Sequence, residues 1–224
     1  MSKYSFLNGS VLKWIAVITM IIDHAGEVLF PEYEILRLIG RISFPIFAFL
    51  LAEGYKHTSS VKKYLLRLFI MALVSEVPFD YCLHGTYFFT THQNIFFELS
   101  LGLVTIYLLD REYVIRKHDI TIISRILIVI ASALAAYFLS FDFRYAGILI
   151  IVAMYYIRDY YRLFAPAIFV IYLCVYGLFN ALFVIIPLLM IYFYNGKRGR
   201  SADVLRWAFY IIYPLHLIII SLFR

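Results

Sequence analysis

Ionisable side chains occur inside apolar runs of this sequence that are long enough to cross a lipid bilayer. The first run, residues 11–30, carries Asp23, His24 and Glu27. One Asp or Arg at the centre of a bilayer costs about 2.5–3.5 kcal/mol, so an ionisable group in such a position indicates a functional site. An imidazole beside carboxylates is a typical set for general acid–base catalysis. The first run therefore predicts a buried site of proton transfer.

Other apolar runs carry ionisable residues as well. Unpaired, a set of this size would cost on the order of 10–20 kcal/mol, which exceeds the stability of a typical domain. We therefore expect these groups to meet one another, and water, inside a bundle of helices. The additional residues are Arg37, Arg41, Glu76, Asp80, Glu98 and His216.

The composition is that of a polytopic membrane protein. Of the 224 residues, 64% are hydrophobic and 15% are charged, and the mean hydropathy is +0.87. A soluble domain is nearer to about 45–50% apolar and about 25% charged. The net charge of +6 does not indicate nucleic-acid binding, because the basic residues lie in short loops between apolar runs. We expect one integral-membrane domain over residues 1–224.

Nine apolar segments predict an all-α bundle of transmembrane helices, with eight or ten spans as the alternatives. Six segments have about the 17–25 residues that a spanning helix needs. The three segments between residues 144 and 194 are shorter and are expected to be tilted, broken or re-entrant. Pro45 is expected to kink the second segment. The segments are 11–30, 35–55, 63–83, 94–110, 121–140, 144–157, 163–177, 180–194 and 204–222.

The basic residues give the orientation. With the N-terminus in the cytoplasm, all but four of the 20 Lys and Arg residues fall on the cytoplasmic side, the exceptions being Arg37, Arg41, Arg144 and Arg224. The positive-inside rule requires such a bias. We therefore predict a multi-pass protein of the plasma or inner membrane. In this orientation the buried ionisable groups other than Glu53 share one depth in the outer half, where we expect a wet pocket that opens toward the exterior.

Lys13 and His24 share one face of the first predicted helix. They are eleven residues apart, which is three turns plus about 20°, and about 16 Å along the helix axis. Glu27 lies on the same face as His24, whereas Asp23 is about 100° around the helix. We therefore expect Glu27 to orient the His24 ring as a general base. The alternative is a lysine that reaches the membrane surface and a core histidine tied to a carboxylate.

Two further pairs have the i, i+4 spacing of helix neighbours. They are Arg37 with Arg41, and Glu76 with Asp80. We expect the two pairs to meet across the outer vestibule, either as a structural ion-pair clamp or as part of the site. In the second case Arg41 or Arg37 would polarise a developing oxyanion. Because acids outnumber these arginines, at least one acid is expected to be protonated or one histidine charged.

Polar residues of the third, fourth and ninth segments form the expected substrate-binding site. His84 and His92 lie in the intervening loop, but no pair of histidines has the spacing of metal ligands, so we expect no metal. The residues expected to bind the substrate are Glu76, Asp80, Gln93, Asn94, Glu98 and His216.

Several linked stretches resemble the TraX family, whose named member is described as the F-pilin acetylase. They read LKWIAVITMIIDHAG, LRLIGRISFPIFAFLLAEGYKHT, KKYLLRLFIMALVSEVPFD and QNIFFELSLG, and they cover about residues 11–110. In the second half the resemblance is limited to apolar character and the closing YPLHL. TraX proteins in turn resemble transmembrane acyltransferases, namely the acyltransferase-three O-acetylating enzymes and heparan-glucosaminide N-acetyltransferase.

The resemblance implies a reaction. In acyltransferase-three enzymes a Lys or Arg, ten residues and then His is the functional signature of the first helix, and Lys13 and His24 fit it. Cytoplasmic acetyl-CoA would thread its pantetheine arm into the bundle, and the acetyl group would reach an acceptor on the far side. The residues expected at the CoA phosphates are Lys13, Lys56, Lys62, Lys63 and Arg67.

We therefore expect an acyltransferase that moves an acetyl group from acetyl-CoA to an amine or hydroxyl of a pilin-like peptide or a glycan outside the membrane. His24 would take the acceptor proton in a direct attack, with an acetyl-histidine relay as the alternative. A different interpretation is a proton-coupled transporter or channel that uses the same carboxylates and histidines as a relay. A third is a non-catalytic assembly protein. Membrane lipid and acyl-CoA are the expected partners.

Overall fold

The computed structural model describes residues 5–115, 120–199 and 204–224, and in these ranges the regular elements are all helices. The all-α prediction is confirmed. The helices are α1 (Gly9–Val28), α2 (Glu34–Gly40), α3 (Ser43–His57), α4 (Val61–His84), α5 (Ile95–Ile115), α6 (Ile120–Phe138), α7 (Arg144–Ile157), α8 (Tyr161–Tyr176), α9 (Leu178–Tyr192) and α10 (Val204–Ser221).

Each of the nine predicted segments coincides with a helix, and the second one is divided. Residues 41–42 interrupt it between α2 and α3. Pro45 explains the break, because its ring collides with the carbonyl of residue 41 and it has no N–H to donate. By length and apolarity, one helical segment of the described residues, Glu34–His57, is able to cross a membrane by itself. Helices α7, α8 and α9 are shorter, as predicted, and the nine-span topology stays a prediction.

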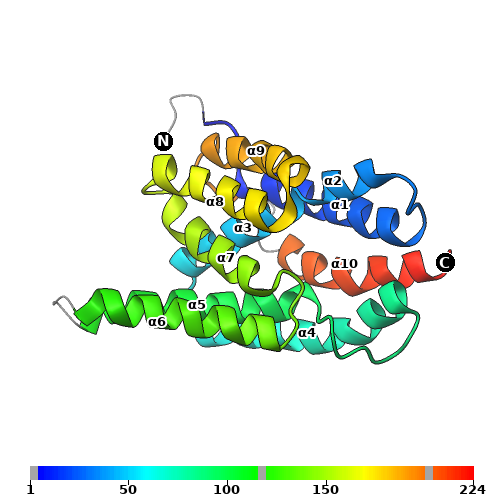
Figure 1. The fold of residues 1–224 in the computed structure, drawn as a ribbon, viewed down its shortest axis with the longest axis horizontal. Coiled ribbons are helices and arrows are strands. Elements are labelled where there is room, and N and C mark those ends of the chain that lie inside the picture. Colours follow the sequence, from blue (N-terminus) through cyan, green and yellow to red (C-terminus); the bar gives the residue numbers. More distant parts are fainter. Residues whose placement is uncertain (1–4, 116–119, 200–203) are drawn as a thin grey trace.

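The bundle has two ends, which we name by the helix termini found there. Figure 1 shows α1, α4 and α10 running along the long axis, with the C-terminus and the α4–α5 loop at the same end. We call this the distal end, and it holds Val28, His84 and Ser221. The opposite, proximal end holds Gly9 and His57. The proximal end corresponds to the predicted cytoplasmic side.

Local sequence signals set several helix ends. The side chain of Asn8 accepts a hydrogen bond from the Val11 backbone N–H at 3.0 Å and caps α1. Ser60 caps α4 in the same way through the Lys63 N–H at 3.3 Å. Gly85 ends α4 in the left-handed region, with φ 71°, which glycine adopts without strain. These ends fix the length of α1 and α4 and therefore the depth of their polar residues.

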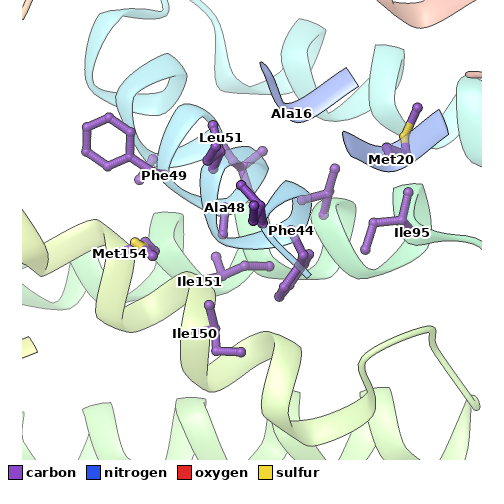
Figure 2. Close-up of a cluster of buried hydrophobic side chains, with 14 of the residues drawn as sticks. Ala16, Met20, Phe44, Ala48, Phe49, Leu51, Ile95, Ile150, Ile151 and Met154 are labelled. Atoms are coloured by element: carbon purple, nitrogen blue, oxygen red, sulfur yellow. The ribbon is translucent and has the colours of Figure 1, made fainter. Parts of the chain in front are cut away.

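Helix α3 forms the centre of the bundle. It packs against α1, α5, α7 and α9. Figure 2 shows Phe44, Ala48 and Leu51 of α3 within a buried cluster that includes Met20 of α1 and Ile151 of α7. This central packing holds α1 in place beside α10 and thereby positions the residues described next.

The outward faces of the peripheral helices are strongly apolar. Helix α6 alone exposes Ile122, Ile123, Ile126, Leu127 and Ile130. Contiguous apolar patches of this kind are rare on monomeric soluble proteins and indicate contact with lipid or with another protein. The outward faces therefore agree with the predicted membrane location.

Candidate functional site

Two buried histidines from opposite ends of the sequence are in direct contact. His24 of α1 and His216 of α10 are 7% and 5% exposed. Nδ1 of His24 lies 2.7 Å from Nε2 of His216, and the two rings stack with centroids 5.0 Å apart. The sequence placed both residues at one depth but gave them separate roles, in catalysis and in acceptor binding. The structure joins them into one unit.

The hydrogen bonds of this pair determine where the protons lie. Nδ1 of His216 is 2.9 Å from the carbonyl oxygen of Ile212. A carbonyl oxygen only accepts, so Nδ1 of His216 must carry the proton, and in the neutral ring Nε2 is then an acceptor. Nδ1–H of His24 therefore donates to it. This assignment leaves Nε2 of His24 with a free lone pair, which is the state that a general base requires.

The prediction that Glu27 orients the His24 ring is wrong. Glu27 pairs with Arg37 instead, with Oε2 and the guanidinium nitrogen 2.7 Å apart. The same nitrogen lies 2.8 Å from the Asp23 carboxylate and donates to the Asp23 carbonyl at 3.1 Å. Helices α1 and α2 are consecutive and form a tight hairpin, so Arg37 meets the acids of α1. The ring of His24 is oriented by His216.

The predicted clamp between the two arginines and the acids of α4 is also absent from the described contacts. Arg37 is held by α1, and the guanidinium of Arg41 lies over the ring of Tyr176, 5.7 Å from its centroid. The carboxylate of Asp23 packs directly against Gly40, where a side chain would collide with it. The two arginines therefore help to fix α2 against its neighbours.

Asn94 ties α4 to the start of α5. Its amide nitrogen donates to the carboxylate of Glu76 and to the carbonyl of Ala72, the latter at 2.8 Å. Its side-chain oxygen accepts from the Phe96 N–H at 3.0 Å. The residue is fully buried. Asn94 and one carboxylate oxygen of Glu76, residues which the sequence assigned to substrate binding, are thus bonded to each other, whereas Oε1 of Glu76 is buried without a hydrogen-bond partner among the described residues.

Asp80 and Glu98 also have internal partners. Asp80 accepts from the Phe89 N–H at 2.7 Å and holds the α4–α5 loop. Glu98 accepts from the Phe143 N–H at 3.2 Å at the start of α7, and its carboxylate packs against Gly147. A carboxylate at a helix N-terminus is favourable because the first N–H groups have no partner in the helix. Glu98 therefore caps α7.

A second histidine pair lies at the distal end. His92 Nε2 is 3.1 Å from the Asp142 carboxylate, and His92 Nδ1 is 3.3 Å from His84 Nε2. Burial lowers the pKa of His92, but the hydrogen bond and charge of Asp142 outweigh it, so the pKa lies above its usual value. Gln93 donates to the Thr90 carbonyl at 3.3 Å. Sequence reasoning missed Asp142, which no helical spacing connects to a histidine.

Among the residues that the structure describes, no group of three His, Cys, Asp or Glu side chains is placed to hold a metal ion.

A cavity of about 400 Å³ runs from the proximal end toward the histidine pair. Its inner end is lined by Met20 of α1 and Tyr213 of α10, among others. Met20 is one helical turn before His24, and the Tyr213 ring lies edge-on to the His24 ring, with centroids 6.1 Å apart. The sequence predicted a pocket that opens toward the exterior. The cavity instead opens on the predicted cytoplasmic side.

The mouth of this cavity is basic. Of the five residues predicted to bind the CoA phosphates, Lys13, Lys63 and Arg67 line it. Lys56 is not in the lining and lies 3.5 Å from Asp159, and Lys62 is not in the lining either.

Two further ionisable residues of the lining were not assigned to the site from the sequence. Arg198 lines the cavity and donates to the His57 carbonyl at 3.0 Å. Buried Glu53 also lines it and is held by Arg158 at 2.9 and 3.0 Å. Glu53 is thus neutralised, so the charge facing a ligand at the mouth is positive.

Comparison with known proteins assigns the chain to a family. The family model described as TraX protein matches residues 8–224. The chain belongs to the TraX family. The resemblance read from residues 11–110 is therefore confirmed and extends through the second half, which includes His216.

Two curated proteins are similar to this TraX chain. It is 26% identical over 241 residues to the probable fimbrial assembly protein FimC, serogroup H1, of Dichelobacter nodosus, an alignment that covers 97% of this chain and 96% of that protein. It is 37% identical over 97 residues to an uncharacterised protein of Rickettsia prowazekii, covering 43% of this chain and 36% of that one. No solved structure matches.

Proposed function

We propose that this protein is a membrane-embedded acyltransferase that moves an acetyl group from cytoplasmic acetyl-CoA to an amine or hydroxyl on the other side of the membrane. One observation carries the proposal. A cavity with a basic mouth ends at Met20 and Tyr213, and the Tyr213 ring contacts a buried histidine, His24, whose Nε2 is free to accept a proton. The apolar outward faces of α6 and the other peripheral helices support a multi-pass location in the plasma or inner membrane.

The mouth has the groups that a phosphorylated ligand requires. Lys13, Lys63, Arg67 and Arg198 line it together with the hydroxyls of Ser59 and Ser60. Hydrogen bonds between charged groups and phosphate oxygens are about twice as strong as neutral ones. The N-terminus of α4, which begins directly after Ser60, adds unpaired N–H groups and a favourable dipole for an anion. The CoA phosphates would bind here.

The inner part of the cavity suits an uncharged arm. Val17 and Met20 line it and lie on the face of α1 between Lys13 and His24. Eleven residues of helix span about 16 Å, and the cavity volume of about 400 Å³ lies within the range of about 300–1,000 Å³ that is usual for small-molecule sites. The pantetheine arm would therefore carry the thioester to the histidine pair.

The histidine pair supplies the base. The acceptor would attack the thioester carbonyl carbon while Nε2 of His24 takes the acceptor proton. The new C–N or C–O bond forms, the C–S bond breaks, and the proton passes to the sulfur of CoA. His216 holds the His24 ring in the reactive tautomer throughout. General acid–base catalysis of this kind contributes about 10²–10⁴-fold to rate.

The distal end is the proposed acceptor side. The polar groups of α1, α2, α4 and the α4–α5 loop gather there, and among them Arg37 contacts Asp23, which precedes His24 on α1. The fimbrial assembly name of the Dichelobacter relative agrees with an acceptor that is exported from the cytoplasm. We therefore propose an extracytoplasmic peptide or glycan as the acceptor.

Transfer from labelled acetyl-CoA tests the proposal. Purified wild-type protein in detergent should bind acetyl-CoA and release CoA when membrane extracts supply the acceptor. His24→Ala should abolish release while it still binds acetyl-CoA. His84→Ala, which removes a histidine outside the cavity, is the matched control and should retain transfer. Unchanged CoA release by His24→Ala, or no acetyl-CoA binding at millimolar concentration by the wild type, would contradict the proposal.

A further inference from the structure

Tyr213 lies where the cavity meets the histidine pair. It stands three residues before His216 on α10 and is 3% exposed. Its ring is edge-on to the rings of His24, His216 and Phe96, with centroid distances of 6.1, 5.4 and 4.9 Å. The same residue lines the inner end of the cavity. A ligand that fills the cavity would therefore touch Tyr213, whose ring packs against His24.

The hydroxyl of Tyr213 is buried in a residue that lines the inner end of the cavity. No hydrogen-bond partner of normal geometry is found for it among the described residues, although the backbone of Ile95 is close. Buried tyrosine hydroxyls usually have a partner, and buried polar groups without one are rare in native proteins. Met20, Ile95 and Phe96 beside it in the lining are apolar. The hydroxyl is thus a buried hydrogen-bond donor with apolar neighbours.

We propose that Tyr213 is a catalytic residue whose hydroxyl donates a hydrogen bond to the carbonyl oxygen of the acetyl thioester, an assignment that rests on the proposed acyltransferase function. This oxygen gains negative charge as the carbonyl carbon becomes tetrahedral. A preorganised donor in a water-poor site stabilises that charge more than water would. Of the arginines first expected in this role, Arg37 is paired with two carboxylates. Arg41 lies over Tyr176, and its Nε is buried without a hydrogen-bond partner among the described residues.

Tyr213 keeps its proton during this step. The acceptor nitrogen or oxygen bonds to the carbonyl carbon and loses its proton to Nε2 of His24. The carbonyl oxygen becomes an oxyanion that accepts the Tyr213 O–H. When the C–S bond breaks, the carbonyl is restored, and the proton on His24 passes to the sulfur of CoA. The tyrosine and the histidine thus act on different atoms, and no other reactant is needed.

Tyr213→Phe tests the assignment, because it removes the hydroxyl and keeps the ring. Loss of one oxyanion donor should lower kcat about 10²–10³-fold. The Kd of acetyl-CoA should change by less than about threefold, since the bond strengthens in the transition state. Tyr137→Phe, at an exposed position of α6 outside the cavity lining, is the control and should keep its kcat.

A spectroscopic measurement separates this catalytic role from a structural one. The infrared stretch of an isotope-labelled thioester carbonyl, in acetyl-CoA bound without acceptor, should shift to lower frequency in the wild type and in Tyr137→Phe. The shift should be lost in Tyr213→Phe. A wild-type rate in Tyr213→Phe, or a carbonyl frequency that does not differ between it and the wild type, would overturn the inference and leave the acyltransferase proposal intact. Absence of acetyl-CoA binding to the wild type would overturn both.

Discussion

His24 and His216 are separated by 192 residues in the sequence, yet their ring nitrogens Nδ1 and Nε2 lie 2.7 Å apart inside the bundle. The Ile212 carbonyl fixes the proton of the second ring, and the second ring fixes the proton of the first. The chain of hydrogen bonds thus runs from the backbone of α10 to the proposed base on α1. Packing of α10 against α1 is therefore a requirement of the chemistry.

Replacement of His216 should affect transfer through the orientation of His24. His216→Leu removes the acceptor of the His24 Nδ1–H, so we expect kcat to fall by about 10–100-fold, as is typical when a supporting hydrogen bond to a reacting group is lost. His216→Gln offers an amide oxygen near the position of Nε2 and should recover part of that loss. The measurement is single-turnover acetyl transfer at saturating acetyl-CoA. Equal rates for the two variants would argue against an orienting role.

Neutralisation of the cavity mouth should weaken CoA binding in a position-dependent way. Lys63→Ala, Arg67→Ala and Arg198→Ala should each raise the Kd of CoA by about tenfold, because a hydrogen bond to a charged group contributes about 1.5–3 kcal/mol. Lys62→Ala is the matched control, since Lys62 precedes Lys63 in the sequence but is outside the cavity lining. Titration calorimetry at two salt concentrations measures the effect. If Lys62→Ala weakened binding as much as Lys63→Ala, CoA would not bind in this cavity.

A side chain at Gly40 should destabilise the protein. A methyl group there would collide with the carboxylate of Asp23 and displace it from Arg37, so Gly40→Ala should cost about 1–3 kcal/mol, which is usual for overpacking. Thermal unfolding in detergent, followed by circular dichroism, reports the loss as a lower Tm. At Gly9 an added methyl group would make ordinary contacts, and Gly9→Ala should leave the Tm nearly unchanged. A Tm that is equally unchanged in Gly40→Ala would show that α2 packs differently.

The pair of His92 and Asp142 should make stability depend on pH. Because the folded-state pKa of His92 lies above its usual value, the charged pair stabilises the fold fully below the unfolded-state pKa of about 6.5. That contribution is lost as the pH rises through the folded-state pKa. His92→Gln should therefore lower the Tm relative to the wild type at pH about 6 and much less at pH about 9. A Tm difference that grows with pH would contradict the assigned charge of His92.

Much of the fold could be predicted from the sequence, because the length of an apolar segment and the residues that interrupt or end a helix act locally. Pro45 marked the break between α2 and α3, and all nine apolar segments became helices. The common face of Lys13 and His24 was also readable, since it depends on helical geometry alone. The hydrogen-bond and ion-pair partners of the polar side chains could not be predicted in the same way. Glu27 has the helical spacing that would place it beside His24. The short α1–α2 turn, however, places Arg37 next to Glu27, and these two residues form an ion pair.

The polar residues of α4 and α5 show the same limit. The sequence around Glu98 indicates no partner for its carboxylate, so we expected it to bind the substrate. Its partner is the N-terminus of α7. This contact depends on the packing of α5 against α7, which the sequence near Glu98 does not determine. Tyr213 carried no sequence signal beyond its place in YPLHL, because an unpartnered hydroxyl is visible only when its surroundings are known.

Disulfide trapping of CoA at Met20 tests most directly whether the cavity delivers the thioester to His24. Cys174 is exposed and would first be replaced by Ser. Met20→Cys, one turn from His24 in the cavity lining, should then react with the disulfide of CoA by thiol–disulfide exchange, which releases one CoA thiol and leaves the other CoA on the protein as a mixed disulfide. Mass spectrometry detects the product, and excess acetyl-CoA should suppress it. Leu215→Cys, on an exposed position of α10, should not be trapped. Trapping at Leu215→Cys but not at Met20→Cys would show that CoA does not enter this cavity.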